Sequence, residues 1–231
     1  MAFNDFDTRP VDTIQEHKPS WRGWIHAGVL PIAIAAGIVL VVLANGVAAK
    51  AVSAIFFATS ILLFGNSALY HRFRWRPRTK KILKRIDHAN ILLLIAGSYT
   101  PITWLALPKG EAVTLMLIIW ITAVIGIGFR VFWISAPRWL YVPIYIGMGW
   151  VALGFVADFM HANAPMMILI LCGGLLYSIG AAFYAFKWPG KNAKHLGFHE
   201  YFHGFTVAAF LCHWTGILLI ALHPAVGTWG A

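Results

Sequence analysis

Five residues have types and spacings that could form a metal centre. Ser67 and His71 are four residues apart, as are His199 and His203, so each pair shares one face of a helix. Three imidazoles with a fourth position left open are the ligand set of catalytic zinc, and an adjacent carboxylate such as Asp87 can accept a proton from the water that zinc activates. The spacing therefore predicts a Zn²⁺ site on the three histidines, with Asp87 and Ser67 as outer catalytic groups. A hydrogen-bonded polar cluster without metal is the alternative.

The run from His199 to His203 also reads H-E-x-x-H, the metalloprotease signature in which the glutamate acts as base. An intramembrane protease is thus a competing interpretation. No Asp or Glu follows Glu200, and Ala209 occupies the last position of the longer H-E-x-x-H-x-x-G-x-x-H form. A third ligand must come from upstream, or from His213 or His223.

The composition indicates helices that cross a membrane. Of 231 residues, 60% are hydrophobic and 11% are charged, against about 25% charged in an ordinary soluble domain. A helix needs about 20 apolar residues to span a bilayer. We predict an all-α membrane protein, a seven-transmembrane helix bundle that forms one domain over residues 1–231, with spans at 24–45, 50–71, 88–107, 111–132, 138–157, 165–186 and 199–222.

The basic residues predict the direction of each span. The net charge is +10, and sixteen Lys and Arg residues fall in the odd-numbered polar segments against two, Lys50 and Lys109, in the even-numbered ones. Short cytoplasmic loops retain Lys and Arg, so the N-terminus is expected inside and the C-terminus outside a cell (inner) membrane. This placement of charge argues against nucleic acid as a partner. The five site residues then fall at similar depth on the cytoplasmic side.

The motifs resemble a known family. Ser67-x-x-x-His71, Asp87 and His199-x-x-x-His203, together with His26 and the run Gly97–Pro101, are similar to the hemolysin III / progestin and adipoQ receptor family. The resemblance implies zinc held by His71, His199 and His203, with Asp87 bonded to a zinc-bound water and Ser67 close by. It also implies a seven-helix bundle with its N-terminus in the cytoplasm. Glu200 is not part of the family's five-residue pattern.

The same resemblance sets the functional expectations. Eukaryotic relatives are lipid-linked receptors with ceramidase-like amide hydrolysis. Bacterial members were named as cytolysins, and some are associated with membrane homeostasis. The short segment before residue 24 favours the compact, bacterial type. We expect a zinc-dependent hydrolase of lipid amides, with membrane lipids as partners. The alternatives are a homeostasis, transport or receptor-like protein with structural zinc, a cytolysin, and the protease. The substrate and the oligomeric state stay open.

Overall fold

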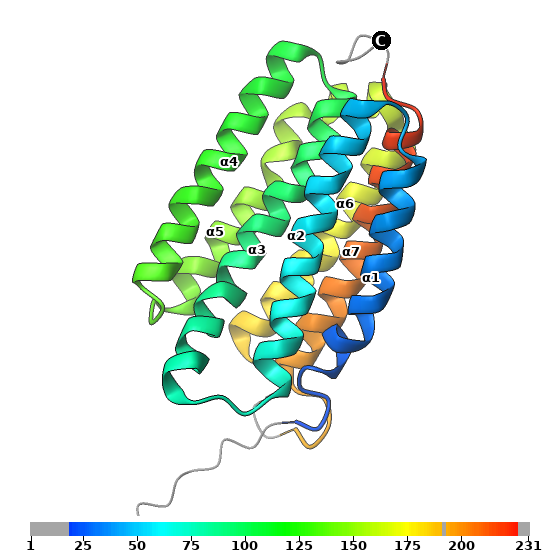
Figure 1. The fold of residues 1–231 in the computed structure, drawn as a ribbon. Coiled ribbons are helices and arrows are strands. Elements are labelled where there is room, and N and C mark those ends of the chain that lie inside the picture. Colours follow the sequence, from blue (N-terminus) through cyan, green and yellow to red (C-terminus); the bar gives the residue numbers. More distant parts are fainter. Residues whose placement is uncertain (1–18, 191–192, 226–231) are drawn as a thin grey trace, which may run out of the picture.

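The computed structural model describes residues 19–190 and 193–225, and all regular secondary structure in those ranges is helical. The prediction of an all-helical membrane bundle is confirmed. The helices are α1 (Trp24–Leu43), α2 (Val47–Arg72), α3 (Pro77–Ala106), α4 (Lys109–Phe132), α5 (Arg138–Trp150), the 3₁₀ helix η1 (Val151–Phe155), α6 (Val156–Phe186) and α7 (Phe198–Leu222). They lie side by side as an elongated bundle (Figure 1).

Six helical segments in the described ranges are long and apolar enough to cross a membrane. One of them, Arg138–Phe186, has 49 residues, which corresponds to about 74 Å of helix against a hydrocarbon core of about 30 Å. Its backbone leaves helical geometry at Asn163, with φ −162° and ψ 94°. The predicted spans 138–157 and 165–186 fall on either side of this break, while the expected loop between them is helical up to Asn163.

The two halves of this long segment run antiparallel. Trp150 Nε1 in the first half donates a hydrogen bond to Ser178 Oγ in the second half at 2.9 Å. Near its ends, Arg138 Nη1 donates to the Tyr184 carbonyl at 2.7 Å. The chain therefore reverses direction near Asn163. A count by length and composition takes Arg138–Phe186 as one segment, and so finds six candidate segments in the described ranges and not seven. Seven membrane passes thus stay a prediction.

The connections between helices gather at the two ends of the bundle as the charge pattern requires. Ser20 N donates to the Lys194 carbonyl at 3.2 Å, joining the segment before α1 to the α6–α7 connection. At the opposite end, Asn45 N donates to the Ala221 carbonyl at 2.8 Å. The end that carries most of the basic residues is at the bottom of Figure 1. Three of the counted basic residues, Arg9, Lys18 and Lys191, lie outside the described ranges. Which end of the bundle faces the cytoplasm stays a prediction.

Helix α3 begins eleven residues before the predicted start at 88, at Pro77. Proline suits the first helical position because its fixed φ is already helical and its missing N–H is not needed there. Many basic residues lie between Arg72 and Arg85, and some of them therefore belong to the first turns of α3. Arg78 and Lys80 are exposed there. Hydropathy placed the start too late because these turns project beyond the apolar part of the helix.

Helix α3 is also the centre of the bundle, since it packs against α2, α4, α5, α6 and α7. Leu92 and Ala96 on it are fully buried. A Cβ atom at Gly97 would lie 2.1 Å from Thr59 Oγ1, so α2 and α3 approach closely at this level. Small residues permit such contact between membrane helices. The outer helices present apolar side chains instead, including Val42 on α1 and Ile125 on α4, which are 63% and 67% exposed.

Candidate metal centre

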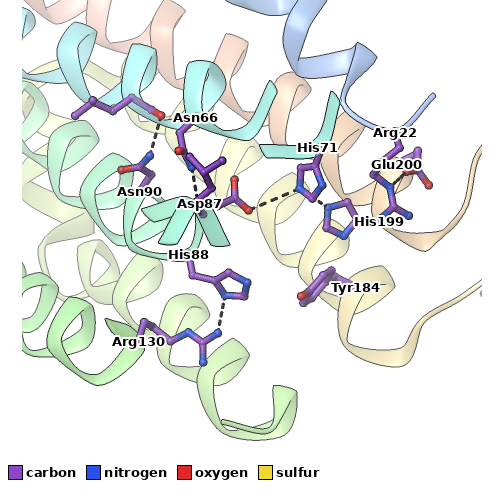
Figure 2. A network of polar contacts seen from close by, with 12 residues as sticks. Arg22, Asn66, His71, Asp87, His88, Asn90, Arg130, Tyr184, His199 and Glu200 are labelled. Atoms are coloured by element: carbon purple, nitrogen blue, oxygen red, sulfur yellow. Dashed lines mark hydrogen bonds and ion pairs between the residues drawn. The ribbon is translucent and has the colours of Figure 1, made fainter. Parts of the chain in front are cut away.

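Three histidines from two helices meet at one end of the bundle. His71 lies in the last turn of α2, and His199 and His203 lie in the first turns of α7. One ring nitrogen from each falls within 4.8 Å of the others. The Nε2 atoms of His71 and His199 are 3.1 Å apart (Figure 2). Two nitrogens bound to one tetrahedral zinc lie about 3.3 Å apart, given Zn–N bonds of about 2.0–2.1 Å. The donor set and the separation of His71 from His199 therefore suit a metal ion such as zinc.

Asp87 and Ser67 border the same space. Asp87 Oδ2 lies 3.7 Å from His71 Nε2, and the Asp87 side chain is 16% exposed. Ser67 is buried one helical turn before His71. Both residues line a cavity together with His199 and His203. The structure thus brings together all five residues that the sequence singled out, while their chemical roles stay proposals.

The cavity has a volume of about 150 Å³ and extends along the bundle axis. Its lining residues on α3 run from Asp87 to Ile102, and those on α7 run from His199 to His213. Fifteen residues of helix correspond to about 22 Å. Away from the histidines the lining is mainly apolar, including Leu94, Met167 and Ile170. The shape suits a linear apolar chain with its polar end at the histidines.

Backbone features at the ends of α1 and α2 position His71. Gly23 has φ +82°, a conformation that side chains with a Cβ rarely adopt. A Cβ atom there would lie 2.9 Å from Arg72 N and 3.0 Å from His71 Cβ. The start of α1 can therefore rest directly on the end of α2 only because residue 23 is glycine.

Two asparagines connect α2 and α3 near the site. Asn90 Nδ2 donates to the Leu62 carbonyl at 2.8 Å, and Asn66 Nδ2 donates to the Leu83 carbonyl at 3.3 Å (Figure 2). Each amide bonds to the backbone of the other helix, so the register of the two helices is fixed. That register places Asp87 opposite His71. Neither asparagine was singled out from the sequence, although a polar amide within an apolar run is a usable signal.

His26 is the nearest aromatic neighbour of the triad outside it. Its ring stacks on that of His203, with centroids 3.8 Å apart and planes 5° from parallel. The side chain is buried, and neither ring nitrogen has a hydrogen-bond partner among the described residues. Two other buried histidines do make hydrogen bonds, His88 to Arg130 and His213 to the Ile170 carbonyl.

Glu200 points away from the triad, which disfavours the protease interpretation. One carboxylate oxygen accepts a hydrogen bond from Gly197 N at 2.9 Å, which caps the start of α7. The other forms an ion pair with Arg22 (Figure 2). Glu200 is also not among the residues that line the cavity. Its carboxylate therefore caps α7 and binds it to the segment before α1.

Sequence reasoning missed a group of polar residues near the site, formed by Arg130, Tyr141 and Tyr184. Arg130 is one of the sixteen basic residues counted in the odd-numbered polar segments, yet it is 1% exposed. Its guanidinium lies over the Tyr141 ring at 4.0 Å, and the Tyr141 and Tyr184 hydroxyls are 3.2 Å apart. The usable signal was its position in the sequence. Arg130 directly follows the uncharged run 112–129, and four more apolar residues, 131–134, follow it.

The fold and this site define a class: helical membrane proteins that gather three histidines beside an internal cavity at one end of the bundle. The chain belongs to the haemolysin-III related family, whose sequence profile matches residues 14–214. The family resemblance stated from the motifs is confirmed.

Individual relatives agree with this assignment. The hemolysin-3 homolog of Bacillus subtilis (strain 168) is 34% identical over 159 residues, covering 68% of this chain and 73% of that protein. Hemolysin-3 of Bacillus cereus is 32% identical over 185 residues, covering 78% and 83%. The adiponectin receptor protein of Drosophila melanogaster is 26% identical over 197 residues, which cover 75% of this chain but 43% of the receptor.

Proposed function

We propose that the protein is a zinc-dependent hydrolase that cleaves the amide bond of acyl lipids. The observation that carries the proposal is the three-histidine cluster at one end of a cavity that is mainly apolar and about 22 Å long. His71, His199 and His203 would hold the metal. When bound, zinc would polarise the amide carbonyl and supply an activated water. The cavity would hold the acyl chain and exclude bulk water from the reacting groups.

In this proposal Asp87 transfers the proton of the attacking water. Its carboxylate lies beside His71 and borders the cavity, so it is placed to accept a proton from the attacking water and pass it to the leaving nitrogen. Ser67 contributes a hydroxyl to the same cavity. In the predicted orientation, with the N-terminus inside, the reaction takes place at the cytoplasmic face of the cell membrane.

A structural metal is the second candidate. The ligands come from two helices, His71 from α2 and His199 and His203 from α7, so one ion would clip these helices together. In that case His71→Ala should lower the thermal stability of the protein as strongly as it lowers any activity. If this variant stays folded and loses only hydrolysis, the metal is catalytic.

Metal analysis combined with an activity assay tests the proposal. The purified wild type should carry about one zinc per chain, and His199→Ala should lose it. His161→Ala is the matched control, since His161 is exposed on α6 and does not line the cavity. The wild type should also release fatty acid from N-acylsphingosines. A wild type without metal would remove the basis of both candidates, whereas zinc-loaded protein inert toward a broad panel of N-acyl lipids would favour the structural one.

A further inference from the structure

Arg130 is a buried cation whose described contacts include no carboxylate. It lies in the last turn of α4 and is 1% exposed. Nη2 lies 2.7 Å from His88 Nδ1, and Nη1 donates to the Trp133 carbonyl at 3.3 Å. The Tyr141 ring covers one face of the guanidinium. A buried charge is normally paired with an opposite one, so this arrangement calls for an explanation.

The contact with Arg130 determines which nitrogen of His88 carries hydrogen. A guanidinium has five N–H donors, no acceptor, and does not lose its proton in proteins. His88 Nδ1 must therefore accept, using its lone pair. A neutral imidazole has one donor and one acceptor nitrogen, so the hydrogen of His88 is on Nε2. The charge of Arg130 also polarises the ring and strengthens Nε2–H as a donor.

This Nε2–H group faces a ligand site. His88 lines the cavity, next in sequence to Asp87, and its ring lies between Arg130 and the region of Asp87 and Tyr184 (Figure 2). Among the described residues no acceptor bonds to Nε2, since the recorded hydrogen bond of this side chain is the one to Arg130. A donor in a largely apolar cavity is costly unless a ligand supplies an acceptor.

We propose that Arg130 fixes His88 in its Nε2–H tautomer and that this N–H binds the carbonyl oxygen of an acyl lipid held in the cavity. Arg130 is then a positioning residue, and His88 is the residue that recognises the carbonyl. The nature of the ligand rests on the proposed function, whereas the tautomer does not. The two histidine systems have separate tasks: the triad binds metal, and His88 orients the acyl group.

The tautomer is tested by nitrogen NMR on the full-length protein in lipid, with histidine ring nitrogens labelled. The His88 signals are assigned by their loss in His88→Gln. In the wild type we expect a single species with Nδ1 unprotonated and Nε2 protonated. Arg130→Met should yield a mixture of tautomers, while Arg78→Met, which removes an exposed arginine, should change nothing. A protonated Nδ1 in the wild type would overturn the proposal.

Carbonyl recognition is tested by infrared spectroscopy of hexadecanamide carrying a ¹³C-labelled carbonyl. Hydrogen bonding lowers the carbonyl stretching frequency, so the bound band should lie lower in the wild type than in His88→Phe. His88→Gln supplies another N–H and should restore part of the shift. If His88→Phe does not fold, Arg130→Lys is compared instead and should show a smaller shift than the wild type.

Repeating the measurement after chelator treatment separates this proposal from the proposed function. A His88-dependent shift that persists without metal supports recognition by His88 even if the protein proves not to hydrolyse amides. We also expect hexadecanamide to bind about tenfold more weakly to His88→Phe, the effect of losing one hydrogen bond to the carbonyl. Equal bands and equal affinities in wild type and His88→Phe would overturn carbonyl recognition, whatever the outcome of the activity assay.

Discussion

His26 lies flat against His203, with the two ring centroids 3.8 Å apart and the planes 5° from parallel. The contact joins α1 to the first turns of α7 and covers one face of a candidate zinc ligand. Because His26 makes no hydrogen bond among the described residues, its contribution to His203 is the flat ring surface. If His203 binds a metal ion as proposed, the stack would hold its ring in a fixed orientation before the ion binds.

We predict that His26→Ala weakens zinc binding by about tenfold, because residues that orient metal ligands contribute 10- to 100-fold in affinity. His26→Phe keeps the flat surface and should bind close to wild type. Competition with a chromophoric chelator measures both affinities. If the phenylalanine variant binds as weakly as the alanine variant, the ring nitrogens of His26 matter and the stacking argument is wrong.

The H-E-x-x-H motif yields a second prediction. Glu200→Gln should reduce the free energy of unfolding by about 1–3 kcal/mol, since it leaves Arg22 without its anionic partner. Arg22 is 21% exposed, so solvent limits the loss. Zinc content and hydrolysis should be unchanged. Thermal unfolding in detergent and metal analysis measure the two effects.

Asp158→Asn is the matched control for this variant, because it removes an exposed carboxylate near the start of α6. It should change neither stability nor metal content. Complete loss of hydrolysis in Glu200→Gln, with stability intact, would revive the protease-like role in which Glu200 acts as base.

The apolar runs predicted the membrane helices well because hydropathy reports directly on burial in lipid. The i, i+4 spacing then selected His71, His199 and His203, since the period of a helix is independent of its packing partners. The charge pattern placed their helix ends together before any contact was considered. These three inferences depend on local sequence alone.

The remaining features depend on packing between distant segments. Arg130 reads as an ordinary basic residue at a helix end, and only the approach of α3 and α5 shows that it is buried against His88 and Tyr141. The stack of His26 on His203 joins residues 177 positions apart (203 minus 26). No spacing rule reaches that far. The predicted connection between the two spans, 158–164, contains the reversal at Asn163, but the residues before Asn163 are helical and not a loop.

Gly23 supports a prediction about how the site is assembled. Gly23→Ala forces a Cβ atom to within 2.9 Å of Arg72 N at a backbone conformation that alanine rarely adopts. The end of α2 must shift, and His71 with it. We expect lower thermal stability and a reduced zinc content. Gly28→Ala on α1 is the control, since a Cβ atom there meets no atom within 4 Å. Equal zinc content in the two variants would show that the packing of α1 on α2 does not position the metal ligands.

The orientation of the chain is tested by labelling single cysteines in sealed cells. Cys172 and Cys212 are first replaced by serine, because both are free thiols. Arg78→Cys at the start of α3 should resist a membrane-impermeant maleimide, since that end is predicted to be cytoplasmic. Gly110→Cys, at the start of α4 and the opposite end of the bundle, should react. The reverse labelling pattern would place the three histidines at the outer face.

Asp87→Asn separates proton transfer from metal binding. The Asp87 carboxylate lies 3.7 Å from His71 Nε2, but it is not one of the three clustered ligands. The asparagine side chain has nearly the same shape and cannot accept a proton, so hydrolysis of N-acylsphingosine should fall by about 10²- to 10⁴-fold in kcat. KM should change little, because in the proposed binding mode the acyl chain would contact the apolar lining and not Asp87. Zinc content should match the wild type. A variant that loses zinc instead would show that Asp87 supports the ligands, and full activity would remove it from the mechanism.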